Sequence, residues 1–362
     1  MVFSNNSTTC PSNKNQDFNK LLGDLQVGSF CIYSFIWVLG ILGNIAVILT
    51  ICRTKRLRSS SNYFIVNLAV ADLASLCIAM PMILIVQITD WPFGLIVCRF
   101  INPLKDLFFH VSMITITVIA MDRYVHTVYP FKTPISLYKV KLIILLIWLV
   151  DYLLIPLPMG FVMKIQRHQM NGHEVCMAIF TPEWQKISIL LLSSFLFLSL
   201  FLTAFAYVGV GFAMFKQRKR IKLRAQDAGI QARSLKRELE KNLKTVKLMM
   251  AIVVAFWLSV LPLTMFALLL ELKVLMPTRE QYVIIFFLVS HLLFLQHCIN
   301  PVILYLLSKD MRAGFYICCT CFAVFRRANA KVKNPQQHLL SNGSGTNEML
   351  KMYSLQDEAE CT

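Results

Sequence analysis

Residues 25–52 of this chain read LQVGSFCIYSFIWVLGILGNIAVILTIC, a run of 28 residues without a single Asp, Glu, Lys or Arg. A helix needs about 20 predominantly apolar residues to cross the hydrocarbon core of a bilayer. Two more charge-free runs of similar length follow at residues 187–215 and 281–308. Each of the three runs therefore predicts a membrane-spanning helix.

Four further windows are almost as apolar and bring the number of predicted spans to seven. They contain only occasional charged residues and cover Tyr63–Thr89, Cys98–Met121, Leu142–Met163 and Leu248–Leu270. The composition agrees, because 57% of the 362 residues are hydrophobic and 15% are charged, against roughly 45–50% and 25% in soluble domains. The sequence thus predicts an all-α membrane protein, a bundle of seven transmembrane helices.

The net charge of +17 reflects basic residues that gather in three connecting segments, at residues 53–58, 216–247 and 309–333. If the spans alternate in direction, these segments share one side of the membrane, and the positive-inside rule makes that side the cytosol. We therefore expect a multi-pass protein of the plasma membrane with its N-terminus outside. Topology and contact with anionic lipid account for the charge, so nucleic acid is not an expected partner.

The chain is expected to divide into four parts along its length. These are an extracellular tail at residues 1–27, the bundle at residues 28–308, an amphipathic eighth helix at residues 309–325 and a cytoplasmic tail at residues 326–362. Apolar and basic residues alternate in the third part, a pattern typical of a short helix that lies in the membrane interface.

Two kinds of covalent modification are predicted outside the bundle. Asn5 and Asn6 each begin a glycosylation sequon, and the two sequons overlap in the predicted extracellular tail. Cys318, Cys319 and Cys321 follow the start of the amphipathic helix, where cysteines near a membrane are targets for palmitoylation. Both predictions agree with the expected topology.

The loop between the fourth and fifth spans, residues 164–177, has Asn171-Gly172 at its centre. Asn-Gly is the strongest two-residue hairpin signal, because both residues tolerate a positive φ. The loop is therefore predicted to form an extracellular β-hairpin over the bundle, with an ordinary polar loop as the alternative.

The spacing of the third span places its two ends on opposite sides of the membrane. Arg123 follows Cys98 by 25 positions, which corresponds to roughly 37 Å along a helix. Cys98 is therefore expected at the outer surface and Arg123 at the inner one. Cys176 lies in the outer loop, so a Cys98–Cys176 disulfide is geometrically available in an oxidising compartment.

The chain resembles the rhodopsin-like (class A) G-protein-coupled receptors over roughly residues 40–315. The motifs that carry this resemblance occur in the family's order within the seven spans. They are Gly43-Asn44, Leu68-Ala69-Val70-Ala71-Asp72, Trp91-Pro92-Phe93-Gly94, Cys98 with Cys176, Asp122-Arg123-Tyr124 with Pro130, Trp148, Tyr207, Phe256 with Pro262, and Asn300-Pro301. Their joint order and spacing is far more specific than any one motif.

This resemblance implies a disulfide between the two outer cysteines and a switch at the cytoplasmic rim. Arg123 is expected to pair with Asp122 at rest and to move towards Tyr207 when the sixth span swings outward, which opens a cleft for a heterotrimeric G protein. The other expected switch residues are Tyr124, Asn300, Pro301 and Tyr305.

The resemblance also implies a polar core made of Asp72, Ser112 and Asn300. In the family this core holds a sodium ion that acts as an allosteric modulator. A water-filled polar cluster without an ion is an equal alternative, because hard cations need several oxygen ligands.

Several residues depart from the family pattern. Val260 replaces the Trp that usually stands two residues before the sixth-span Pro, and Asn242 replaces a Glu that often locks Arg123. In the seventh span, Tyr305 lies one position further from Asn300-Pro301 than the Tyr of the family motif. Ser199 stands where the fifth span usually has a Pro. We therefore expect a weakened resting lock, and an orphan or constitutively active receptor-like protein remains an alternative function.

The outer half of the bundle offers a mixed set of charged and aromatic side chains for a ligand. Mixed charge around a wide mouth suits a peptide, and the overall pattern is most similar to neuropeptide receptors. The candidate ligand-binding residues are Gln87, Lys105, Asp106, Phe109, Phe266, Glu271 and His291.

Other ligand classes are disfavoured by particular positions. The seventh span has no lysine for a retinal Schiff base, which excludes a light receptor. The Asp of amine receptors would fall at Lys105, and the neighbouring Asp106 is expected to face a different direction. A small amine is therefore the less favoured ligand.

Classes other than receptors find little support. Paired repeats, which are typical of secondary transporters, are not visible, and His291 and His297 lack metal-ligand spacing on one helix face, so we expect no enzyme. Asp151 in the fourth span receives no role from the sequence. The Ser and Thr residues of the tail are too sparse to decide whether arrestin is a partner.

Overall fold

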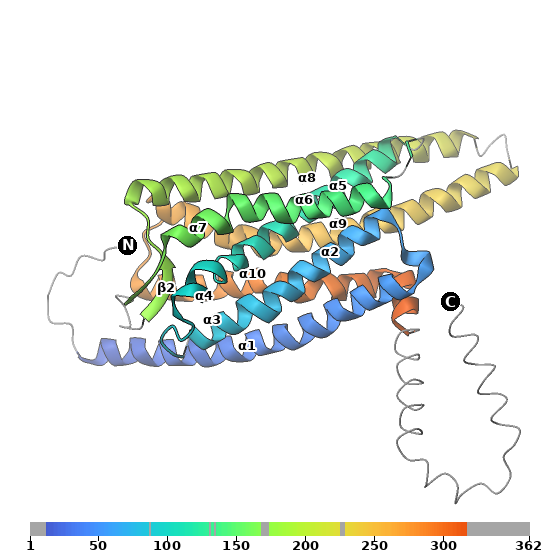
Figure 1. Cartoon of the computed structure of the whole chain (residues 1–362). Coiled ribbons are helices and arrows are strands. Elements are labelled where there is room, and N and C mark those ends of the chain that lie inside the picture. The colour runs from blue at the N-terminus through green and yellow to red at the C-terminus, as the bar shows by residue number, and fades with distance from the viewer. Residues whose placement is uncertain are drawn as a thin grey trace, which may run out of the picture. The chain divides into compact units, whose positions relative to one another are not determined.

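Seven helices of the computed structural model are long and apolar enough to cross a membrane (Figure 1). The structure describes residues 12–86, 88–129, 132–133, 135–167, 174–224 and 229–316. Within these residues the spans are Lys20–Arg53, Ser60–Val86, Gly94–Val128, Leu137–Val162, Pro182–Arg220, Asn242–Glu271 and Arg279–Leu307. The prediction of a seven-helix bundle is confirmed.

The helices run side by side, and several spans consist of more than one element (Figure 1). The elements are α1 (Ser12–Arg53), η1 (Lys55–Leu57), α2 (Ser60–Ala74), η2 (Ser75–Ala79), α3 (Met80–Val86), α4 (Gly94–Phe100), α5 (Leu104–Val128), α6 (Leu137–Leu154), α7 (Pro156–Val162), β1 (Met163–Arg167), β2 (Glu174–Ala178), α8 (Pro182–Arg224), α9 (Gly229–Glu271) and α10 (Arg279–Leu307). Residues 309–316 are also helical, at the position of the predicted eighth helix.

Local sequence explains where three of the helices begin. Ser59 caps α2 and Ser136 caps α6, each by accepting a hydrogen bond from a backbone N–H of the first turn. Thr278 and Gln281 form a capping box at the start of α10. Such caps satisfy backbone donors that have no partner inside the helix.

The third and fourth spans are interrupted near the same end of the bundle. The third span is not one straight helix, as the spacing argument assumed, because residues 101–103 form a turn between α4 and α5. Pro103 and Pro156 stand at the starts of α5 and α7, where a residue without a backbone N–H is tolerated and a continuous helix is not.

Helix α1 begins at Ser12, well before the start near Gly28 that the charge-free run suggested. Its first turns are held by packing, since Phe18 is buried and the Arg279 guanidinium lies 4.3 Å from the centre of its ring. A cation over an aromatic ring is a favourable contact. Polar residues therefore extend this helix beyond the apolar span.

The bundle buries one large apolar core and leaves apolar side chains on its outer surface. Phe64, Met113, Ile116 and Phe256 are fully buried in the core, where α2, α5 and α9 meet. Phe201, by contrast, is 66% exposed, one of many large apolar side chains on the outside. An apolar exterior of this kind fits lipid as the solvent.

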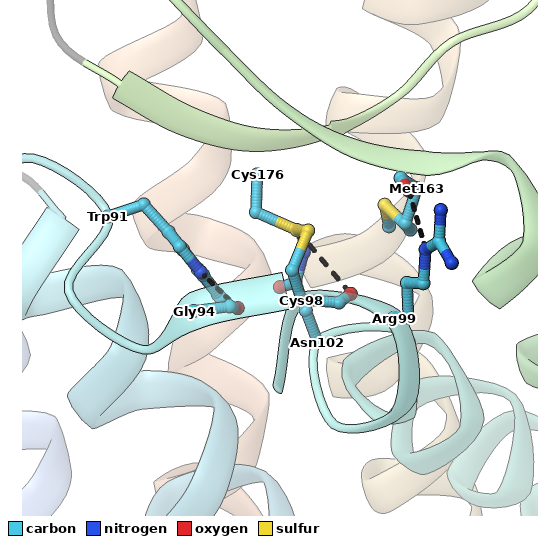
Figure 2. The surroundings of a disulfide bond; sticks show 7 residues. All are labelled: Trp91, Gly94, Cys98, Arg99, Asn102, Met163 and Cys176. Atoms are coloured by element: carbon cyan, nitrogen blue, oxygen red, sulfur yellow. Dashed lines mark hydrogen bonds between the residues drawn. A yellow bond between two sulfur atoms is a disulfide. The ribbon is translucent and has the colours of Figure 1, made fainter. Parts of the chain in front are cut away.

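A two-stranded antiparallel sheet follows α7, as the hairpin prediction required. β1 and β2 pair with Ile165 opposite Cys176, while the predicted turn at Asn171-Gly172 lies outside the described residues. Figure 2 shows the Cys98–Cys176 disulfide that joins β2 to α4. The Asn102 side chain donates a hydrogen bond to the Cys176 sulfur at 3.2 Å. This part of the molecule is called the disulfide end below.

Candidate functional site

A cavity of about 410 Å³ lies inside the half of the bundle that is nearer the disulfide end. Its walls come from η2, α3, α5, α7, α8, α9 and α10, and most of its lining is apolar. We call it the central cavity. Its polar lining is confined to a few side chains, which are Ser75, Lys105, Asp106, His110, Ser193, Thr264, Gln296 and His297.

Three of the predicted ligand-binding residues line this cavity, namely Lys105, Asp106 and Phe109. Lys105 and Asp106 both border this cavity, although they leave the helix in different directions. Neighbouring residues of a helix differ by about 100°, and the cavity wraps far enough around the start of α5 to meet both. A lysine and an aspartate thus lie side by side in one cavity wall.

Three other predicted ligand-binding residues, which the structure describes, do not line the central cavity. Phe266 is buried against Tyr282, with ring centres 5.7 Å apart, and His291 stacks on Tyr33 at 4.3 Å. Glu271 is the last residue of α9. Gln87 lies outside the described residues, as do the modification sites Asn5, Asn6, Cys318, Cys319 and Cys321.

Gln296 is a lining residue that the sequence argument missed. Its side chain is 1% exposed, and neither its amide nitrogen nor its amide oxygen has a hydrogen-bond partner among the described residues. An unpaired buried amide costs free energy, which a ligand with both a donor and an acceptor would recover. The sequence does contain a signal for this residue, because Gln296 is a polar side chain within the apolar run of the seventh span.

Below this cavity, Asp72 is held by two donors from α10. His297 Nδ1 lies 2.8 Å from Asp72 Oδ1, and the Asn300 amide donates to Asp72 Oδ2 at 3.0 Å. The other ring nitrogen of His297 lies 3.1 Å from the Ser75 hydroxyl. All four side chains are buried. The sequence argument did not link His297 to Asp72.

This arrangement does not fit the sodium ion that the family resemblance implies. Each carboxylate oxygen of Asp72 already has a nitrogen of the protein beside it. Ser112, the third expected ligand, donates to the backbone carbonyl of Phe108 on its own helix at 3.0 Å. A hard cation needs several oxygens directed at one point, and of these three side chains only Asn300 has an oxygen, Oδ1, without a hydrogen-bond partner among the described residues.

Two buried asparagines tie the neighbouring spans to this core. The Asn44 amide donates to the carbonyl of His297 at 2.8 Å and so joins α1 to α10. Asn67 donates to Thr115 at 2.8 Å and accepts from the Trp148 indole at 2.8 Å, which joins α2 to α5 and α6. These two asparagines are therefore paired between helices, as a low-dielectric surrounding favours.

At the opposite end of the bundle, Asp122 is held more closely by other residues than by Arg123. Arg123 Nη2 lies 3.7 Å from Asp122 Oδ2, whereas Ser61 donates to that oxygen at 2.6 Å. His126 Nε2 lies 3.2 Å from the other oxygen. The expected Asp122–Arg123 pair is present, but it is long. We call this region the Arg123 end.

The remaining predicted switch residues are only partly brought together here. Tyr207 is half-buried, and its hydroxyl has no hydrogen-bond partner in the described part of the chain. Tyr124 packs on Gly209, where a Cβ would collide with its ring. Tyr305 is 38% exposed, while Leu304 is buried in the main core. The one-residue shift of this tyrosine therefore turns it away from the core.

Two prolines interrupt the hydrogen bonding of the sixth and seventh spans. Pro262 lies inside α9 and Pro301 inside α10, and each removes one hydrogen bond from its helix ladder. A Cβ on Gly43 would lie 2.7 Å from Pro301 Cγ. Glycine at this position therefore lets α1 pack closely against the irregular part of α10.

Comparison with known proteins agrees with this geometry. A sequence profile described as 7 transmembrane receptor (rhodopsin family) matches residues 43–304. The chain is 26% identical over 299 residues to neuropeptide FF receptor 2 of Rattus norvegicus, covering 78% of this chain and 70% of the relative. It is 30% identical over 280 residues to the urotensin-2 receptor of Macaca mulatta (76% and 67%) and 27% identical over 299 residues to the substance-P receptor of Cavia porcellus (79% and 70%).

Proposed function

Because this chain belongs to the rhodopsin family of seven-transmembrane receptors, we propose that it binds an extracellular peptide in the central cavity and activates a heterotrimeric G protein at the Arg123 end. The observation that carries the proposal is the lining of the central cavity. It combines a cation, an acid and the unpaired amide of Gln296 within apolar walls. A peptide supplies all the matching groups, namely charged ends or side chains and backbone amides.

The size of the cavity limits how much of a peptide can enter. A volume of about 410 Å³ lies near the lower end of the usual range for ligand pockets, so it takes the end of a peptide and not a whole chain. The rest of the ligand would lie against the β1–β2 hairpin above. The names of the relatives, receptors for neuropeptide FF, urotensin-2 and substance P, support a peptide ligand.

Orientation and signalling follow from the distribution of charge. The three basic segments of the sequence favour the cytosol for the Arg123 end and a plasma membrane location. Outward movement of α9 about Pro262 would expose Arg123 to the G protein and let it approach the unpaired hydroxyl of Tyr207. Arrestin is a further candidate partner at the same end, and the bilayer surrounds the bundle.

A peptide-library screen that records calcium and cAMP in transfected cells tests this function. We expect a response to one peptide family, with a potency that falls at least tenfold in Gln296→Leu and in Asp106→Asn. Glu183→Gln is the matched control, because Glu183 is exposed and does not line the cavity. Equal potency in all three variants would place the ligand elsewhere.

A small amine is the second candidate ligand, and the position of Asp106 in the cavity favours it. A protonated amine could pair with this carboxylate directly. The same screen separates the two candidates. A response to small amines alone that is abolished by Asp106→Ala would exclude the peptide.

A further inference from the structure

A second cavity, of about 720 Å³, lies between α6, α7 and the start of α8. We call it the lateral cavity. Its lining is almost entirely apolar, and several of its lining residues are on the outer surface of the bundle. Leu154 is 69% exposed, Trp184 63% and Leu191 65%. In a protein whose outer surface meets lipid, this cavity opens towards the bilayer.

Asp151 lines this cavity and lacks adequate partners. Its side chain is 4% exposed, and its Oδ2 atom has no hydrogen-bond partner among the described residues. Its Oδ1 atom lies 3.9 Å from His110 Nδ1, which is too long for a hydrogen bond. Nothing else in the described structure compensates for burying a carboxyl at membrane depth, and such groups are costly unless they serve a function.

We infer that the lateral cavity binds an amphiphilic amine from the bilayer, with the apolar chain along α7 and α8 and the protonated amine against Asp151. Charge decides the class of headgroup, because the free carboxylate oxygen attracts an ammonium group and repels a carboxylate or phosphate. An ammonium group also has three N–H donors, so one can reach Oδ2. The apolar walls exclude a strongly hydrated ligand.

The lateral cavity shares part of its wall with the central cavity. Ile155, Met159 and Leu192 line both cavities. His110, the nearest polar neighbour of Asp151, lines the central cavity. An amine that draws Asp151 towards the lipid side therefore changes the surroundings of His110, so the lateral site is placed to modulate whatever the central cavity binds.

Photolabelling of the purified full-length chain in phosphatidylcholine nanodiscs tests the inference. The probe is octadecylamine with a diazirine in its chain, and labelled peptides are identified by mass spectrometry. We expect labelling concentrated in residues 151–162 and 179–195 and suppressed by unlabelled octadecylamine. Octadecanol and octadecanoic acid should compete at least tenfold more weakly, and equal competition by either one would overturn the amine headgroup.

Three variants locate the site. Asp151→Asn should reduce the labelling at least tenfold. Leu191→Trp should do the same by filling the cavity from its exposed rim, and it keeps the test decisive if Asp151→Asn does not fold. Leu198→Trp is the matched control, because Leu198 is 53% exposed on the same helix and does not line the cavity. Labelling that is spread along the lipid-facing helices and is unchanged in both test variants would contradict the proposal.

Discussion

Two buried acid–histidine pairs in this molecule have the same chemistry and different geometry. In the inner pair, Asp72 and His297 are 2.8 Å apart, and the other carboxylate oxygen accepts from Asn300. In the lateral pair, Asp151 and His110 are 3.9 Å apart, and the other carboxylate oxygen has no partner in the described residues. The first acid is satisfied by the protein, and the second is not.

The surroundings of the two acids account for this difference. Asp72 is completely enclosed between α2 and α10, and donors from α10 lie beside both of its carboxylate oxygens. Asp151 lies where the fourth span breaks into α6 and α7, beside an apolar cavity. A buried acid in a membrane bundle therefore links helices where the packing supplies hydrogen-bond donors for its carboxylate. Where the packing supplies no such donors, the carboxylate is available to bind a ligand.

One expected effect concerns sodium at the inner pair. Replacing sodium chloride by choline chloride should leave the Tm of the purified wild-type chain unchanged. The His297 ring already lies against the Asp72 carboxylate, where a sodium ion would otherwise bind. His297→Ser replaces a nitrogen by an oxygen and leaves space, so this variant should become more stable in sodium. The gain is about 1.4 kcal/mol at a sodium concentration of roughly ten times Kd. A sodium-dependent Tm in the wild type would contradict the comparison.

A smaller effect is expected at the Arg123 end, where Asp122 forms a third acid–histidine pair with His126. No described acid of α9 pairs with Arg123, and Asn242 stands where the family often has a Glu. Ligand-free signalling should therefore exceed that of mock-transfected cells. Asn242→Glu should lower it about fivefold, since an added ion pair contributes about 1 kcal/mol, while Asn242→Gln should not. Basal signalling at the mock level in the wild type would contradict the weakened lock.

Features that depend on local pattern were predictable from the sequence. Charge-free runs located the spans and Asn171-Gly172 indicated the β1–β2 hairpin, and each of these follows from a short segment. The Cys98–Cys176 disulfide was geometrically available, and its pairing was implied by the family resemblance. No knowledge of helix rotation was needed.

The inner pair could not be predicted in the same way, because its members are 225 positions apart on different helices. Whether His297 faces Asp72 depends on how α2 and α10 are rotated relative to each other, and both spans are irregular, with the π-type turn of η2 after α2 and a proline inside α10. The place of Asp106 in the cavity lining could not be predicted for a similar reason. Helix geometry gives its direction but not the extent of the cavity around α5.

The difference between the two pairs is tested most directly by removing each carboxylate charge in turn and measuring Tm in detergent. Asp72→Asn leaves buried donors of His297 and Asn300 without a charged acceptor and should lower Tm by roughly 6–12 °C. Asp151→Asn should change Tm by less than about 2 °C, because this carboxylate has no close partner to lose. Equal losses in the two variants would show that Asp151 is held as firmly as Asp72 and would contradict the account.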